Sequence, residues 1–185
     1  MKYLNYFQYN SKVILSYFFL SLIVLFLNKL TNKKSTIKFF SSCRGSVFNP
    51  LTFITMFTHI LGHDNFNHLK SNFIYILLIG PLVEEKYGSI NLLIMILVTS
   101  FLTALVNILF GKKRILGSSG ISFMLIILSS IVNINSGKIP ITLILVFVFY
   151  VVGEIVDGLF KKDNISHLSH LLGALSGIVF GYYFL

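Results

Sequence analysis

The sequence predicts an all-α membrane protein, a bundle of six transmembrane helices with a long interfacial first loop. Hydrophobic residues make up 55% of the 185 residues and charged residues only 11%, whereas about a quarter of the residues in soluble domains are charged. The apolar residues also gather in runs that approach the ~20 residues needed to cross a bilayer as a helix. A chain of this length is enough for one domain.

The apolar runs divide the chain into a short tail, residues 1–10, and one membrane domain, residues 11–185. The predicted spans are residues 13–30, 68–83, 90–110, 119–135, 139–159 and 165–185. The first run is long for a signal peptide and lacks the small residues of a cleavage site, so we expect it to stay in the protein as a span. We therefore expect a multi-pass protein of the cell membrane.

The link between the first two spans, residues 31–67, is long for a compact domain. Loops of this length are usually functional or carry structure of their own. Phenylalanine and other apolar residues alternate with lysine, serine and asparagine along it. This composition is typical of a segment that lies in the membrane interface.

The charge pattern points to lipid as a partner. The formal net charge is +9, but the basic residues are scattered between apolar runs, as expected for loops that face lipid headgroups. We therefore expect the lipid bilayer, and no nucleic acid, as a partner. Cys43 is the single cysteine, which excludes an internal disulfide framework.

A small, hydroxyl-bearing tetrad, Gly117-Ser118-Ser119-Gly120, stands where the fourth predicted span begins. Helix N-termini carry unpaired backbone N–H groups and the positive end of the helix dipole. A serine at this place would lie beside donors that can hold a developing oxyanion. By itself the tetrad favours an ordinary Gly/Ser turn before a span.

Polar side chains also gather at the start of the second predicted span. His68 and Asn72 are one helical turn apart, and His59 and His63 precede them in the sequence. Ionisable and amide groups in membrane segments are costly and usually face a bundle interior or a water-filled cavity. We therefore expect this cluster to point into the bundle.

Two histidines, His167 and His170, enter the last span. At about 100° per residue, Gly173 and Gly177 lie on the same helix face as His170 and well away from His167. A stripe of glycines lets a neighbouring helix approach closely. His170 is thus the histidine that can reach a partner on another helix, either as a general base or as a packing residue bonded to a carbonyl.

The second, fourth and sixth spans start on the same membrane face, so Ser119, His170, His68 and Asn72 converge. This convergence favours a serine nucleophile with a histidine base. A multi-histidine metal or haem membrane protein is the competing interpretation, since His59 and a histidine four residues on have ligand spacing. Cysteine and acidic partners are missing from that cluster, so we expect no metal and no cofactor.

Several motifs occur in an order and spacing that resembles the rhomboid intramembrane serine proteases. The resemblance covers nearly the whole chain after the first span. The motifs are His59-x-x-x-His63-x-x-x-x-His68-x-x-x-Asn72, Val83-Glu84-Glu85-Lys86-Tyr87-Gly88-Ser89, Gly117-Ser118-Ser119-Gly120, and His170-Leu171-Leu172-Gly173 with Gly177.

The resemblance implies a role for each matching residue. Ser119 would be the nucleophile and His170 its base, in a dyad without an aspartate. The oxyanion and substrate-binding group would consist of His68, Asn72, Gly117 and Phe123, with Phe123 packing on the catalytic imidazole and the Ser119 backbone N–H as a further donor. Structural residues near the site would be Glu84, Gly173 and Gly177. The substrate would be a membrane protein with a transmembrane segment.

The chain departs from the family pattern in two places. It contains no tryptophan, so the Trp-Arg pair often found in the first loop is absent, and Ala174 replaces a frequent glycine. These departures affect how the first loop packs and leave the dyad in place. A catalytically inactive rhomboid-like scaffold is the alternative function that remains.

Overall fold

The computed structural model describes residues 8–111, 113–132, 139, 141–153, 155–156 and 167–184. Every regular element in these ranges is helical, apart from one isolated β-bridge. The elements are α1 (Lys12–Leu30), α2 (Lys34–Phe39), α3 (Pro50–Thr58), the 3₁₀ turn η2 (His59–Leu61), α4 (Phe66–Tyr87), α5 (Ser89–Phe110), α6 (Ser119–Ile131), α7 (Ile141–Val146), the π-helical turn η3 (Phe147–Val152) and α9 (His167–Tyr183).

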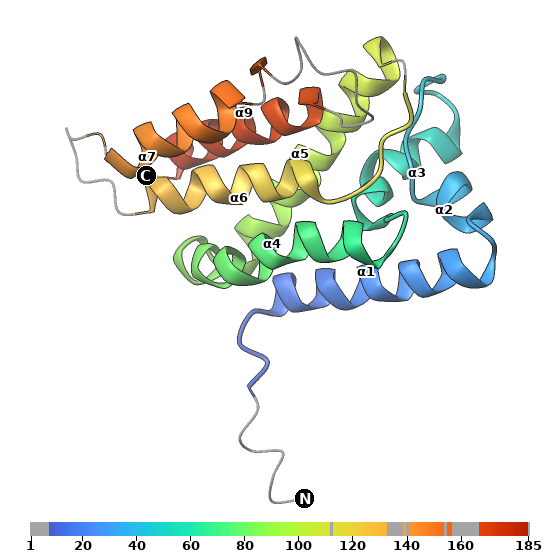
Figure 1. Cartoon of the computed structure of the whole chain (residues 1–185), viewed down its shortest axis with the longest axis horizontal. Coiled ribbons are helices and arrows are strands. Elements are labelled where there is room, and N and C mark those ends of the chain that lie inside the picture. Colours follow the sequence, from blue (N-terminus) through green and yellow to red (C-terminus); the bar gives the residue numbers. More distant parts are fainter. Residues whose placement is uncertain are drawn as a thin grey trace, which may run out of the picture.

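The long helices pack side by side in the order α1, α4, α6, α9, and α5 crosses behind them (Figure 1). The C-terminal end of α1 and the N-terminal ends of α4, α6 and α9 lie at the same end of the bundle, where α2 and α3 also lie. The main core lies between α1, α4 and α6, with Tyr17, Phe73 and Met124 among its buried members. The predicted convergence of three helix starts is therefore present.

A helix occupies each predicted span over its described part. Among the described residues, α1 and α5 are long and apolar enough to cross a membrane by length and composition. α6 is apolar but has 13 residues, and α4 carries polar residues at both ends. Parts of the predicted spans 119–135, 139–159 and 165–185 lie outside the described residues.

The predicted interfacial loop, residues 31–67, carries three short helices of its own, α2, α3 and η2. α3 begins where the sequence provides both start signals: the Asn49 side chain accepts from Leu51 N, and Pro50 occupies the first turn, where its missing N–H costs nothing. Ser42 and Ile115 exchange two backbone hydrogen bonds of 2.8 Å. The first loop is thereby fastened to the segment that leads into α6.

Glu84 fastens the other end of the bundle. Its carboxylate accepts from Val13 N at 3.0 Å, from Ile14 N at 3.1 Å and from the Ser89 hydroxyl at 2.6 Å. These amides belong to the first turn of α1, whose N–H groups have no partner within the helix. Glu84 thus joins the start of α1 to the α4–α5 junction. It is 16 residues, or about 24 Å of helix, from His68, so it does not lie near the site as the sequence suggested.

Candidate active site

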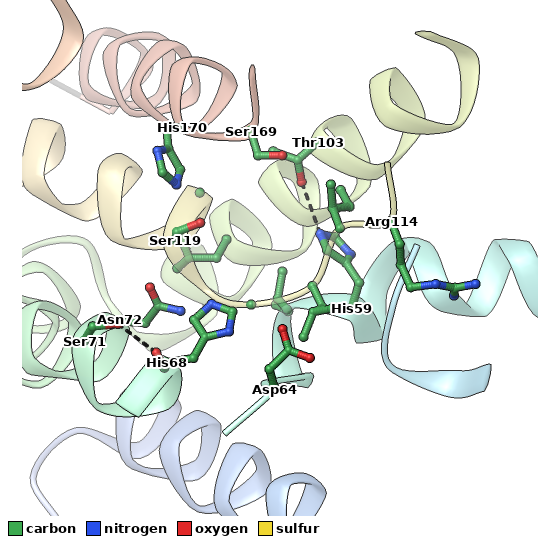
Figure 2. A pocket seen from close by; sticks show the side chains of 16 residues that line it. His59, Asp64, His68, Ser71, Asn72, Thr103, Arg114, Ser119, Ser169 and His170 are labelled. Carbon is green, nitrogen blue, oxygen red and sulfur yellow. Dashed lines mark hydrogen bonds between the residues drawn. The ribbon is translucent and has the colours of Figure 1, made fainter. Parts of the chain in front are cut away.

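The polar residues converge on one cavity of about 390 Å³ at the end of the bundle where α4, α6 and α9 begin. Figure 2 shows its side chains, which come from the first loop, α4, α5, the segment before α6, α6 itself and α9. Among the residues that line it are His59, His68, Asn72, Thr103, Gly117, Ser119 and His170. Residues that lie as far apart in the sequence as His59 and His170 therefore contribute to a single hollow.

Ser119 is the first residue of α6, directly after the N-cap residue Ser118. Its hydroxyl lies beside the first turn of the helix, whose N–H groups lack intrahelical partners. Figure 2 places the Ser119 side chain between His170 on one side and Asn72 and His68 on the other. This position suits a nucleophile, since a base and a set of donors flank it.

Gly117 brings the Ser119 segment against α4. Its φ of +106° is a conformation that side-chain-bearing residues rarely adopt. A Cβ added there would lie 2.7 Å from His68 Nε2 and 3.3 Å from Asn72 Nδ2. Only a glycine backbone can pass this close to the two side chains, so the donors expected from the sequence do lie beside the Ser119 loop.

His170 is held between α9 and α6 and is 8% exposed. Its imidazole stacks on the Phe123 ring, with centroids 4.6 Å apart and an interplanar angle of 9°. Phe123 lies four residues after Ser119 on the same face of α6. One helix thus carries both the serine and the ring that orients the histidine.

Glycines set the distance between these two helices. A Cβ on Gly173 would lie 2.0 Å from the Gly120 carbonyl oxygen, and one on Gly177 would lie 2.7 Å from the Met124 carbonyl oxygen. The backbones of α6 and α9 are therefore in direct contact, as the glycine stripe predicts. His170, one turn before Gly173, lines the cavity together with Ser169, whereas His167 is not among the lining residues.

The sequence did not assign a role to His63 and Ser118, which connect the donors to the first loop. His63 Nε2 lies 3.3 Å from Asn72 Nδ2 and 3.3 Å from the Ser118 hydroxyl. That hydroxyl donates to Ile60 O at 2.9 Å, and His63 Nδ1 lies 3.1 Å from Leu61 O. A carbonyl only accepts, so neutral His63 carries its proton on Nδ1 and accepts from Asn72 through Nε2.

Burial keeps this arrangement in the neutral form. Desolvation, and secondarily the charge of nearby His68, lowers the pKa of His63 to about 4. His63 is therefore an acceptor for the Asn72 amide throughout the neutral pH range. The signal in the sequence was its place in the histidine cluster, but spacing could not indicate which partner it contacts.

His59 ties the first loop to α5 and to the segment before Ser119. Its ring lies 3.2 Å from Thr55 O through Nδ1 and 3.4 Å from the Thr103 hydroxyl through Nε2. Its own carbonyl accepts from Gly117 N at 3.0 Å. Burial lowers the pKa of His59 to about 4. Thr103 is a cavity residue that sequence reasoning missed, although Thr99 stands one turn before it as a polar residue in an apolar span.

The described residues contain no group of three or more His, Cys, Asp or Glu side chains that could hold a metal ion. His59 and His63, the pair with ligand spacing, each have a ring nitrogen within hydrogen-bond distance of a backbone carbonyl. Their pattern in this part of the chain is that of structural histidines.

Comparison with known proteins gives the family. The model of the Rhomboid domain matches residues 50–185. Rhomboid-like protein 11, chloroplastic, of Arabidopsis thaliana is 29% identical over 132 residues, which cover 63% of this chain and 47% of that protein. Rhomboid-related protein 1 of Caenorhabditis elegans is 30% identical over 132 residues, which cover 65% and 36%. The match spans less than half of the length of these relatives.

Proposed function

The chain belongs to the rhomboid family and is a membrane protein, and on this premise we propose that it is an intramembrane serine endopeptidase. Ser119 is its nucleophile and His170 its general base. The substrate is a membrane protein with a transmembrane segment, cut near the membrane face at which the cavity lies. Six spans, 13–30, 68–83, 90–110, 119–135, 139–159 and 165–185, make the protein multi-pass, and its location is the cell membrane.

One observation carries the proposal: Ser119, His170, His68 and Asn72 line the same cavity, and Gly117 sets the serine loop against the two donors. A packing stripe would account for the glycines of α9 alone. Such a stripe would not account for a serine at a helix start, a stacked imidazole, and one amide and one imidazole donor around the same cavity.

The chemistry follows from this placement. His170 removes the Ser119 proton as the oxygen attacks the scissile carbonyl carbon, which gives a tetrahedral oxyanion. Asn72, His68 and the Ser119 backbone N–H donate to that oxyanion, and fixed donors of this kind contribute several kcal/mol in a shielded site. His170 then protonates the leaving amine, and water hydrolyses the acyl-serine through the reverse proton transfers.

The test uses the full chain in liposomes with a panel of single-span membrane proteins as substrates. We expect cleavage by the wild type, labelling by a serine-reactive fluorophosphonate probe, and loss of both in Ser119→Ala. The control is Ser71→Ala, a hydroxyl that also lines the cavity but donates to the His68 carbonyl. A folded wild type that is neither labelled nor active would instead favour an inactive scaffold.

A further inference from the structure

A second hollow, a groove of about 540 Å³, lies between the end of α1 and the start of α4. Leu22, Leu25 and Phe26 form its wall on α1, and Phe66 contributes from the first turn of α4. Phe26 and Phe66 are each 61% exposed. The groove is therefore an open, apolar channel that runs along α1 toward the end of the helix.

The groove ends in positive charge. Lys29, in the last turn of α1, and Lys33 line its polar end. Lys33 has a φ of +68°, and its backbone N–H donates to the Asn28 carbonyl at 2.8 Å. Lys34 and Lys38 line a neighbouring hollow of about 490 Å³ on α2. All four lysines are exposed. Two ammonium groups therefore stand at the end of the channel, and two more belong to the hollow beside it.

The chain offers these lysines little counter-charge. The first 63 residues contain no aspartate or glutamate, so α1 and α2 supply none. Asp64, which also lines the catalytic cavity, is the one carboxylate on the groove wall. Basic side chains near a membrane surface attract anionic lipid, and here they stand beside an apolar channel of the kind that accepts an acyl chain.

We propose that the groove binds one anionic glycerophospholipid, of which phosphatidylglycerol is the probe. The phosphate lies between Lys29 and Lys33, and one acyl chain follows Leu22, Leu25 and Phe26. Leu22, Leu25 and Phe26 belong to the proposed span 13–30, so a lipid can lay an acyl chain along them within the bilayer while its phosphate stays at the lysines. Free phosphate cannot use this apolar wall. The α1 wall precedes residues 50–185, which match the Rhomboid domain, so the family assignment gives it no role.

Native mass spectrometry of the full chain, titrated with phosphatidylglycerol or phosphatidylcholine, tests this site. The wild type should retain one phosphatidylglycerol in preference to phosphatidylcholine. Lys29→Gln with Lys33→Gln should weaken that binding roughly 30-fold, since each lysine near an anionic surface strengthens binding about fivefold. The matched control is Lys86→Gln, an exposed lysine at the far end of α4, which should bind as the wild type does.

A second measurement keeps the proposal testable if the double variant folds poorly. Phosphatidylglycerol should raise the unfolding midpoint of the wild type in a concentration-dependent way. It should raise the midpoint of the single variant Lys33→Gln by a smaller amount. Equal retention of both lipids, or an unchanged preference in the lysine variants, would overturn the proposal. Competition by glycerol phosphate alone would point to a site for free anions. If phosphatidylethanolamine bound equally well and Asp64→Asn abolished its binding, the groove would be a site for amines. Either result also overturns the proposal.

Discussion

The two walls of the cavity around Ser119 are built by different physical means. On the α6–α9 side, glycines bring two backbones into contact, and the His170 imidazole is fixed by its stack on Phe123. On the α4 side, the donor Asn72 is held by a chain of hydrogen bonds that runs through His63 to the first loop. The α6–α9 wall therefore depends on residues without a side chain, and the α4 wall depends on hydrogen-bond partners.

This difference predicts how each wall responds to mutation. Where two helix backbones touch at glycines, a single added Cβ must displace one helix, because protein interiors leave no room for it. A hydrogen-bonded wall loses its function in steps, because neighbouring donors can replace one another in part.

The largest effect should come from the proposed dyad. Ser119→Ala or His170→Ala should lower kcat by on the order of 10⁶, as the loss of a nucleophile or its base does in other serine proteases. His167→Ala is the matched control on the same helix and should keep most of the activity, because His167 is not among the cavity residues. Initial rates of substrate cleavage in liposomes measure this effect. If His167→Ala abolished cleavage and His170→Ala did not, His170 would not be the base.

On the hydrogen-bonded wall, Asn72→Ala should lower kcat by about 10²–10³, the usual cost of removing one oxyanion donor. His68→Ala should lower it by a similar or smaller factor, since the Ser119 N–H and Asn72 remain. KM should change little in both, because the donors act on the transition state. A rate equal to that of the wild type in both variants would remove these side chains from the site.

Gly173→Ala tests the backbone contact. The added Cβ would lie 2.0 Å from the Gly120 carbonyl oxygen, so α9 must shift, at a cost of about 1–3 kcal/mol in stability. A displacement of about 1 Å at a reacting group can cost 10² in rate, so cleavage should fall together with the unfolding midpoint.

Gly153→Ala is the control for the glycine substitution. A Cβ at that position meets no atom of the described residues within 4 Å, so we expect little change in midpoint or rate. If Gly173→Ala melted and cleaved as the wild type does, the α6–α9 contact would not be what sets the position of His170.

The sequence predicted much of this comparison, and its limits have a physical cause. Helical periodicity selected His170 rather than His167 and placed the α9 glycines on the same helix face as His170, because an α-helix fixes the directions of its side chains. Spacing could not find the His63–Asn72 contact, since it joins a loop to a helix and depends on the path of the loop. The family resemblance also put Glu84 near the site, because a motif gives a residue type and not its distance from the cavity.

The helices within the first loop show the same limit. Asn49-Pro50 is a recognisable start signal, but α2 and η2 are too short to have a periodicity. Their positions depend on contacts such as the Ser42–Ile115 bridge and the bond from the Arg114 guanidinium to the Ile37 carbonyl at 2.8 Å. These contacts join segments about 75 residues apart, which a local pattern does not report.

A smaller effect is expected at His63, which does not touch the reacting atoms in our proposal and acts through Asn72. His63→Leu removes the acceptor for the amide, so kcat should fall by about tenfold, less than in Asn72→Ala. The double variant with Asn72→Ala should be no slower than Asn72→Ala alone, because the effect of His63 passes through that amide. An additive double variant would mean that His63 acts by another route.

The smallest effect concerns pH. Burial holds the pKa of His59 and His63 at about 4 in the folded protein, against about 6.5 in the unfolded chain. The unfolded state therefore binds protons first as the pH falls, and stability should decrease between about pH 6.5 and pH 4, by at most about 1.4 kcal/mol per pH unit for each histidine. Unfolding midpoints of the wild type and His63→Leu across this range measure the effect. The variant should show the shallower decline, and equal slopes would mean that His63 titrates in the folded state as it does in the unfolded chain.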